Sequence, residues 1–304
     1  GLGDVYKRQN MNNEKITRRE ALKCMGTTLA GLALSASGLS SITSCTEKKK
    51  RRLVFYFTGT GNCLYVARKF AENPLSIPQI IRQDKLEFEA DEIGIVYPIY
   101  GHLAPQIVQE FIRKARLKAP YLFSILTYGN RKCSATELWN NLATENGTRF
   151  DYITTLKMVD NFLPSFDMNE QVKIDKQEDK QIAEIMQDIQ ARKHWIQPVT
   201  EEERQQHAKF MQRAGHTLSP SAEKLLVIKE NCIGCGICVK VCPRRNYTLT
   251  GEGVQCKGAC EYCLSCVQNC PQKAITLRAG EKNPDARYRH PDISLNDIIR
   301  ANRQ

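Results

Sequence analysis

The sequence predicts an α/β fold, a doubly wound parallel sheet, followed by a small cysteine-rich α+β domain. Two observations support this prediction. Between residues 53 and 160, apolar runs of strand length alternate with helical segments, which is typical of a parallel sheet covered by helices. Two cysteine runs of identical spacing then occupy residues 232–271, and repeats of this kind indicate metal binding rather than ordinary packing.

The elements of the first domain follow from apolar runs and their flanking turns. Residues 53–57 predict the first strand, and residues 64–72 predict a helix directly after it. Further strands are expected at 92–97, 121–126 and 152–159, with a weak strand near 77–81. Helices are expected at 105–114 and 135–144. Parallel strands with intervening helices therefore account for most of this region.

The turn after the first strand has the composition of an anion-binding loop. Unpaired amides and the helix dipole converge where a Gly-rich turn enters a helix. This turn resembles the loop of flavodoxins that holds the FMN phosphate, and the resemblance implies a strand order of 2-1-3-4-5. The implied FMN-binding residues here are Thr58, Gly59, Thr60, Gly61, Asn62 and Cys63. The sequence departs from the family at Cys63, because flavodoxins have a hydroxyl there and a thiol is a weaker donor.

Two later loops leave the carboxyl ends of expected parallel strands, which is where open α/β sheets bind ligands. The resemblance to flavodoxins implies flavin contacts from Pro98, Ile99, Tyr100 and Gly101, and from Thr127, Tyr128, Gly129 and Asn130. Tyr100 and Tyr128 could stack on the flavin ring or only pack at the rim. His102 is interpreted as a loop histidine rather than a catalyst, and Cys133 as an ordinary thiol.

Each cysteine run has the spacing C-x2-C-x2-C-x3-C-P. The runs are Cys232, Cys235, Cys238 and Cys242 with Pro243, then Cys260, Cys263, Cys266 and Cys270 with Pro271. This spacing is that of bacterial ferredoxins with two [4Fe–4S] clusters, in which the fourth cysteine of each run ligates the other cluster. One cluster would therefore take Cys270 as its fourth ligand, and the other would take Cys242. The alternatives are zinc, which usually takes two separated ligand pairs, and disulfides.

The segment between the two domains, residues 161–224, has no site motif. Ile182, Ile185, Met186 and Ile189 have helical spacing and predict an amphipathic helix. Thr200 and Glu203 form a capping box that predicts a second helix. A ferredoxin-type domain at 225–280 follows, with strands expected at 225–228 and 274–277, and a polar tail at 281–304. Cys256 lies outside both runs, so nothing in the pattern requires it to bind iron.

The formal charge of +11 lies mostly near the N-terminus, because residues 1–52 contain 11 of the 44 Lys and Arg but only 4 of the 33 Asp and Glu. No nucleic-acid motif accompanies this charge, so we expect no nucleic-acid partner.

The N-terminal segment resembles a targeting signal. Residues 1–10 show no pattern of a folded element, and Met11 is the expected start. Residues 11–45 resemble a twin-arginine signal at Arg18 and Arg19 that ends in a lipobox at Cys45, before a basic linker at 46–52. The expected location is the periplasmic side of a membrane through a lipid anchor, and the alternative is cytoplasmic.

The order of parts, with a flavodoxin-like domain at 53–160 before the cysteine runs, resembles the family of flavodoxin–ferredoxin fusion proteins. The resemblance implies two [4Fe–4S] clusters, FMN, and single-electron transfer with redox partner proteins. A second hypothesis is a flavin-dependent reductase of a small-molecule acceptor such as a quinone. A third treats the flavodoxin-like domain as an empty interaction module that docks a ferredoxin. The sequence contains no acid–base dyad or nucleophile–histidine pair that would identify a catalytic residue.

Overall fold

The computed structural model describes residues 50–214, 221–251 and 253–302, which belong to one compact unit. The predicted signal, the lipobox at Cys45 and the first two lysines of the basic run lie outside the described residues. Among the helices of the described residues, none has the length and apolar character needed to cross a membrane.

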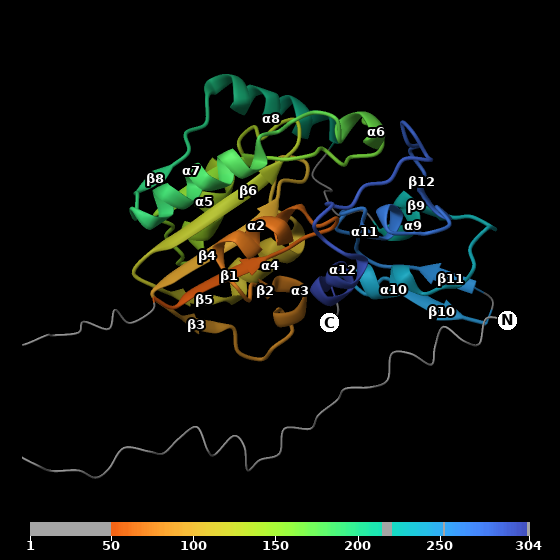
Figure 1. The fold of residues 1–304 in the computed structure, drawn as a ribbon, viewed down its shortest axis with the longest axis horizontal. Coiled ribbons are helices and arrows are strands. Elements are labelled where there is room, and N and C mark those ends of the chain that lie inside the picture. Colours follow the sequence, from red (N-terminus) through yellow and green to blue (C-terminus); the bar gives the residue numbers. More distant parts are fainter. Residues whose placement is uncertain (1–49, 215–220, 252, 303–304) are drawn as a thin grey trace, which may run out of the picture. The chain divides into compact units, whose positions relative to one another are not determined.

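A six-stranded, fully parallel sheet forms the core of residues 50–214, here called the α/β part (Figure 1). Its strands, in spatial order, are β2 (Leu75–Ser76), β1 (Arg52–Tyr56), β4 (Glu92–Pro98), β6 (Leu122–Tyr128), β7 (Tyr152–Lys157) and β8 (Trp195–Ile196). The sequence predicted five strands, and β8 adds a sixth beyond β7.

The prediction of a strand near 77–81 was wrong. Residues Ile77–Ile80 form the short helix α3, and the strand β2 is the two residues before it. Pro78 explains the difference, because a proline has no backbone N–H to donate to a sheet but fits the first turn of a helix.

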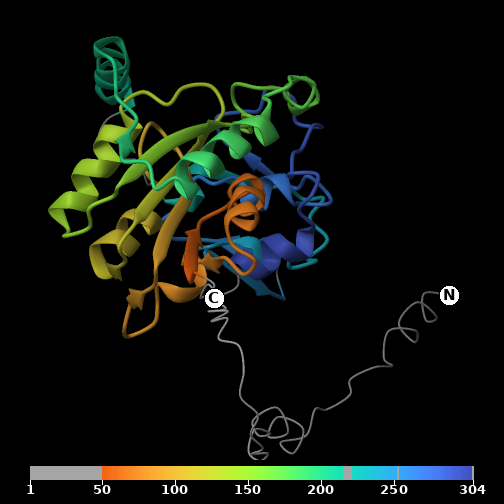
Figure 2. The ribbon, with the colours of Figure 1, turned by 60° about the vertical axis from the view of Figure 1, so that its left-hand side comes forward.

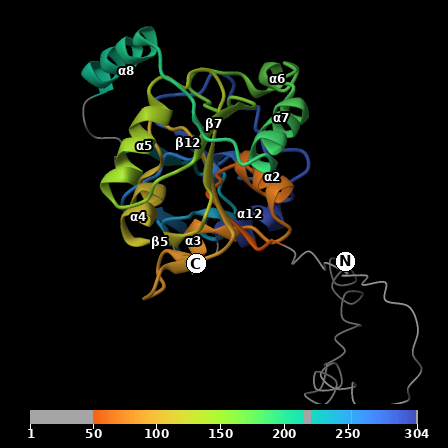
Figure 3. The ribbon, with the colours of Figure 1, turned by 90° about the vertical axis from the view of Figure 1, so that its left-hand side faces the viewer.

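Helices cover both faces of the sheet, as Figure 3 shows in an end-on view. α2 (Asn62–Phe70) and α7 (Glu178–Gln190) lie on one face, and α4 (Gln106–Lys114) and α5 (Ala135–Glu145) lie on the other. Side chains of β1 alternate between the faces: Val54 and Tyr56 belong to one buried cluster, and Phe55 and Phe57 to the other. The strands in the middle of the sheet are buried on both sides, as parallel strands usually are.

The remaining elements of the α/β part are peripheral. β3 (Glu87–Glu89) pairs with β5 (Arg116–Lys118), while α6 (Met168–Gln171) and α8 (Glu201–Ala214) follow the last long strand. The predicted capping box is present at α8, because the Thr200 amide donates to Glu203 Oε2 at 2.9 Å and the Glu203 amide donates to Thr200 Oγ1 at 3.2 Å. In α7, which packs against β7, the predicted apolar stripe is buried at Ile182, Ile185 and Ile189 and partly buried at Met186.

The described residues between 221 and 302, here called the cysteine-rich part, form two small antiparallel sheets and four short helices, drawn in cyan to blue in Figure 2. β9 (Leu226–Ile228) pairs with β12 (Ile275–Leu277), and β10 (Tyr247–Thr250) pairs with β11 (Gly253–Cys256). The helices are α9 (Ala222–Leu225), α10 (Ile237–Val241), α11 (Ser265–Gln268) and α12 (Leu295–Asn302). The strands expected on either side of the cysteine runs therefore pair with each other.

The tail of the cysteine-rich part returns to the α/β part. The His290 amide donates to the carbonyl oxygen of Thr60 at 2.9 Å, and the Tyr288 hydroxyl donates to Asn62 Oδ1 at 2.8 Å. In α12, Asp297 forms an ion pair with Arg68 of α2 at 2.6 Å. The tail thus holds the loop between β1 and α2 from the outside.

Candidate functional site

The two cysteine runs have left-handed backbone conformations at equivalent positions. Gly234 and Tyr262, at equivalent positions, have φ values of 65° and 54°, and Gly236 and Leu264 have values of 71° and 57°. These left-handed conformations suit glycine, and a non-glycine residue there costs on the order of 1–3 kcal/mol. The second run therefore adopts the same left-handed conformations at an energetic cost. This cost indicates that the arrangement of its cysteines requires these conformations.

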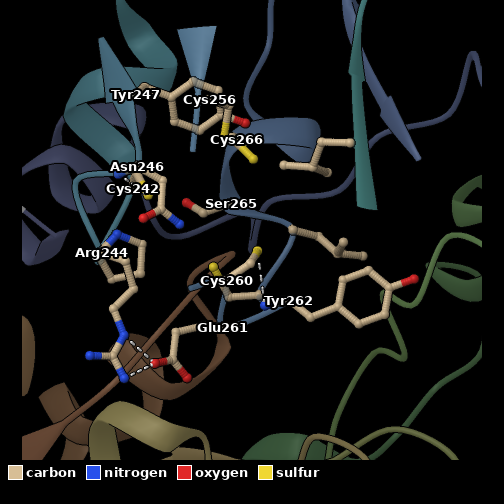
Figure 4. Close-up of a pocket in the computed structure, with 14 residues that line it drawn as sticks. Cys242, Arg244, Asn246, Tyr247, Cys256, Cys260, Glu261, Tyr262, Ser265 and Cys266 are labelled. Atoms are coloured by element: carbon tan, nitrogen blue, oxygen red, sulfur yellow. Dashed lines mark hydrogen bonds and ion pairs between the residues drawn. The ribbon is translucent and has the colours of Figure 1, made fainter. Parts of the chain in front are cut away.

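The fourth cysteine of the first run lies with the first three of the second. Cys242, Cys260, Cys263 and Cys266 line one cavity, which Figure 4 shows together with its other lining residues. All but Cys260 are buried. These four residues, here called the second cysteine set, are the ones predicted to share a cluster if the two runs exchange their fourth ligands.

The other four cysteines of the two runs form the complementary set, here called the first cysteine set. Burial raises the pKa of Cys238 to about 11, and the neighbouring thiols that raise it further are Cys232, Cys235 and Cys270. Cys270, from the second run, thus lies with the first three cysteines of the first run. Cys235 is exposed, so this set lies nearer to solvent than the other.

Backbone amides donate to sulfur at equivalent positions of the two runs. The Asn246 amide lies 3.4 Å from Cys242 Sγ, and the Ala274 amide lies 3.2 Å from Cys270 Sγ. Such hydrogen bonds stabilise thiolates and are one means by which a protein sets the potential of a cluster. Among the described residues, no three His, Cys, Asp or Glu side chains are placed to hold a single metal ion. The ligands of a cubane bind four different iron atoms, so they need not converge on one point.

A larger cavity of about 490 Å³ lies at the carboxyl ends of the parallel strands, and this volume is within the range of small-molecule sites. It is lined by thirteen of the fourteen residues predicted to bind a flavin: Thr58, Gly59, Thr60, Asn62, Cys63, Pro98, Ile99, Tyr100, Gly101, Thr127, Tyr128, Gly129 and Asn130. The three loops therefore converge on one site.

Gly61 is the predicted residue that does not line this cavity. It has a φ of 108°, and a Cβ atom added there would lie 3.0 Å from the Cβ atoms of His290 and Ile293 in the tail. Its amide donates to Thr58 Oγ1 at 3.0 Å, which closes the turn. Gly61 is therefore needed for the loop conformation and for close packing of the tail.

Cys63 lines the cavity from the first turn of α2. Its sulfur lies 3.1 Å from Thr127 Oγ1, and burial raises its pKa to about 12, so that it is a neutral thiol. The first amides of α2 have no partner within the helix, which leaves them available to an anion. The thiol at Cys63 is a weak donor, so the donors that this loop offers to an anion are its backbone amides.

The structure adds lining residues that the sequence did not single out. The loop after β7 contributes Val159, Asp160, Asn161, Phe162, Ser165 and Phe166, and Arg131 and Phe210 also line the cavity. His102, interpreted from the sequence as a loop histidine, is part of the lining as well. The region after residue 160, expected to contain no site residues, therefore covers one side of the cavity. The sequence could have indicated this loop only by its place after an expected strand, because it also leaves the carboxyl end of a parallel strand.

His102 packs inside a small cluster at the edge of the cavity. Its Nε2 atom lies 3.4 Å from Cys133 Sγ, and its Nδ1 atom lies 3.4 Å from Nδ1 of His207 in α8. Burial, assisted by His207 and Arg131, lowers the pKa of His102 to about 4. Burial also raises the pKa of Cys133. Both groups are neutral near pH 7, so this pair is not an activated nucleophile and base.

The two cavities share one wall. Glu261, Tyr262, Cys263 and Leu264 line both of them. Gly59 of the first loop packs against this wall so closely that an added Cβ would lie 2.4 Å from the carbonyl oxygen of Cys263. Cys263, a predicted cluster ligand, and the expected phosphate loop are therefore in direct contact.

A buried carboxylate fixes this wall. Glu261 Oε1 accepts a hydrogen bond from the amide of Ile107, at the start of α4, at 3.0 Å. Arg244, two residues after Cys242, forms an ion pair with Glu261, which Figure 4 shows, and a second ion pair with Glu110 of α4. These contacts hold the second set of cysteines against the α/β part.

Comparisons with known proteins support the metal-binding part of this description. Residues 225–246 match the family described as 4Fe-4S binding domain. No curated protein matches the chain. Two solved structures resemble part of it: a candidate flavoprotein from Bacteroides uniformis ATCC 8492, with 18% identity over 36% of this chain and 92% of that chain, and one from Bacteroides eggerthii DSM 20697, with 20% identity over 36% and 89%. Both have a TM-score of 0.28, which is too low to support a fold assignment. The parallel strand order of the sheet identifies the α/β fold.

The matched segment contains all four cysteines of the first run and the start of the strand pair that encloses both runs. The cysteine-rich part of the chain therefore carries a 4Fe–4S binding domain, whose chemistry is iron–sulfur electron transfer.

Proposed function

We propose that this protein transfers single electrons through two [4Fe–4S] clusters, to or from an FMN held by the α/β part. The clusters would exchange one electron at a time and the flavin one or two. The first cluster would be held by Cys232, Cys235, Cys238 and Cys270, and the second by Cys260, Cys263, Cys266 and Cys242. The residues present fit both groups, because thiols and flavin-site loops line two adjoining cavities.

The observation that carries this proposal is the shared wall at Cys263. This residue lines the cavity of the second cysteine set and the larger cavity, and Gly59 packs on its backbone. An electron leaving the second set would need to cross only this wall to reach a flavin. The exposed Cys235 places the first set nearer to solvent, which favours it as the point of exchange with a redox partner protein.

The α/β part would bind the flavin through groups of different chemistry. The first-turn amides of α2 suit the phosphate, as helix N-termini generally suit anions. Tyr100 and Tyr128 offer aromatic faces to the ring system, and both lie in the cavity lining. The Thr58 and Thr60 side chains support the loop, since Thr58 accepts from Gly61 and Thr60 accepts from Asn161.

A second candidate is a reductase of a small aromatic acceptor such as a quinone. The observation that favours it is the group of phenylalanines Phe162, Phe166 and Phe210 in the lining of the larger cavity. Their faces would suit a planar apolar acceptor beside a bound flavin. Steady-state turnover with quinones under anaerobic conditions separates this candidate from a pure carrier, since a carrier shows no saturable turnover.

Two cysteine substitutions test the ligand sets. We expect Cys235→Ser and Cys263→Ser each to lose most of one cluster and to destabilise the other, because the runs exchange their fourth ligands. Iron and acid-labile sulfide measured after anaerobic purification give the result. Cys263→Ser should also perturb the flavin absorption spectrum more strongly than Cys235→Ser does, because Cys263 alone of the two lines both cavities.

Cys133→Ser is the matched control, since Cys133 is a buried thiol outside both runs. It should retain the iron and sulfide content of the wild type. Full retention of iron in Cys235→Ser or Cys263→Ser would contradict the assigned ligand sets. Loss of iron in Cys133→Ser as well would show that iron content reports general unfolding.

A further inference from the structure

The hairpin of β10 and β11 places two side chains against the second cysteine set. Tyr247 and Cys256 are directly opposite each other across this antiparallel pair. Both line the cavity that also contains Cys242, Cys260, Cys263 and Cys266. Figure 4 shows Tyr247, Cys256 and Cys266 together at one end of this cavity. The hairpin thus brings a phenol and a fifth sulfur to a site whose four ligands are already supplied.

The Tyr247 hydroxyl is buried without a well-aligned hydrogen bond. The residue is 5% exposed, and its oxygen has no hydrogen-bond partner among the described residues. A buried hydroxyl left unpaired destabilises a protein, so buried hydroxyls usually have a hydrogen-bond partner. The Cys256 and Cys266 side chains lie beside the Tyr247 side chain in the cavity, as Figure 4 shows.

The two sulfurs differ in what they can offer. Cys266 belongs to the second ligand set, and a thiolate that binds iron is a hydrogen-bond acceptor. Cys256 lies four residues before Cys260 and belongs to neither run. A free thiol is a weak donor and a weak acceptor, so Cys256 can hold the phenol in position without competing strongly for its proton.

We propose that Tyr247 donates a hydrogen bond to the ligand sulfur of Cys266 and thereby raises the reduction potential of the second cluster, with Cys256 as the residue that positions the phenol. A cluster gains negative charge on reduction, and a donor aimed at its ligand sulfur stabilises that charge. The second cluster, next to the larger cavity, would then be easier to reduce than without the phenol. This inference rests on the proposed occupancy of the second cysteine set.

Removal of the phenol oxygen tests the proposal. In Tyr247→Phe we expect full iron content and a more negative midpoint potential for one of the two clusters, measured by an EPR-monitored redox titration of the intact protein. The expected shift is on the order of a tenfold change in the one-electron reduction equilibrium, or about 59 mV. Thr248→Val is the control, because it removes an exposed hydroxyl from the next position of the same strand.

A second measurement on the same two proteins probes the hydrogen bond without a redox titration. In the wild type, the iron–thiolate stretching bands in the resonance Raman spectrum should shift in D2O, and part of this shift should be absent from Tyr247→Phe. Unchanged potentials in Tyr247→Phe, or an identical D2O effect in both proteins, would overturn the proposal. A wild type that lacks one of the two clusters would instead contradict the proposed function.

Cys256 has its own test. Cys256→Ala should retain the wild-type iron content and should shift the potential of the same cluster in the same direction as Tyr247→Phe, by a smaller amount. Loss of iron from Cys256→Ala would mean that Cys256 is itself a ligand, and this outcome would overturn its assignment as a positioning residue.

Discussion

Gly59 and Cys263 meet where the two candidate sites adjoin, and their contact depends on the absence of a side chain at Gly59. A Cβ atom there would lie 2.4 Å from the carbonyl oxygen of Cys263 and 3.2 Å from its Cβ atom. The first distance is far shorter than a normal van der Waals contact, and the obstructing atom belongs to the backbone. Any side chain at this position must therefore push the two parts of the chain apart.

We expect Gly59→Ala to lower the free energy of unfolding by about 1–3 kcal/mol, the usual cost of overpacking a close contact. The variant should also bind flavin more weakly, because the displaced loop lines the larger cavity. Denaturant unfolding and flavin titration give the two results.

Gly251→Ala provides the control, since nothing lies within 4 Å of an added Cβ at this position. It should be close to wild type in both measurements. A Gly59→Ala protein with wild-type stability and flavin affinity would show that the contact is not as close as described.

At the residue scale, the sequence predicts site residues whose positions depend only on neighbouring residues in the chain. The cysteine spacing identified both runs because it reflects how three successive thiols wrap a cluster. The loop residues after β1, β4 and β6 were predicted because they follow strands. Gly61 differs because its open side faces His290 and Ile293, more than 220 residues away in sequence. A loop motif cannot predict contacts with residues so far away in the sequence.

Helix α8 is held over one edge of the larger cavity by contacts between aromatic rings. His102 contacts Phe210, with ring centroids 4.5 Å apart, and also faces His207. Burial lowers the pKa of both histidines, and for His102 the lowered value is about 4. Protonation of either ring would place a charge inside this contact, next to Arg131.

The pH dependence of stability follows from this pKa. The unfolded chain takes up a proton on His102 below its ordinary pKa of about 6.5, while the folded chain does so only near pH 4. Stability should therefore fall as the pH decreases from 6.5 towards 4, by about 1 kcal/mol between pH 7.5 and pH 5.5.

The measurement is denaturant unfolding at these two pH values for the wild type and for His102→Asn. The variant should lose a substantial part of this pH dependence, with His207 responsible for some of the rest. An equal pH dependence in both proteins would contradict a buried, neutral His102.

At the element scale, the sequence predicted long segments better than short ones. The apolar stripe of α7 and the capping box of α8 are complete within one element, so they are visible in the sequence. β8 has two residues and β2 has two, too few for a periodic pattern. The hairpin of β10 and β11 was not predicted either, although it positions Tyr247 and Cys256.

At the scale of the whole molecule, the α/β part and the cysteine-rich part share one buried cluster. Val54 and Leu64 on one side and Val241, Val267 and Ile298 on the other belong to it. The predicted borders near residues 160 and 225 stay a prediction. The contacts across them could not be derived from the sequence, because they join segments that lie far apart along the chain.

This arrangement has a consequence for the cofactors. If Cys263 and the loop at Gly59 form one wall, then the iron–sulfur and flavin sites depend on each other for their shape. A preparation that is full in one cofactor should then be full in the other.

The most direct test of the account is the amount of iron, acid-labile sulfide and released flavin in one sample of wild-type protein, purified without oxygen from cells that assemble such clusters. We predict about eight iron atoms, about eight sulfides and about one FMN per chain, as two [4Fe–4S] clusters and one flavin site require. A protein that contains flavin but no iron, or neither of them, would contradict the central claim that two thiolate-bound clusters adjoin a flavin site.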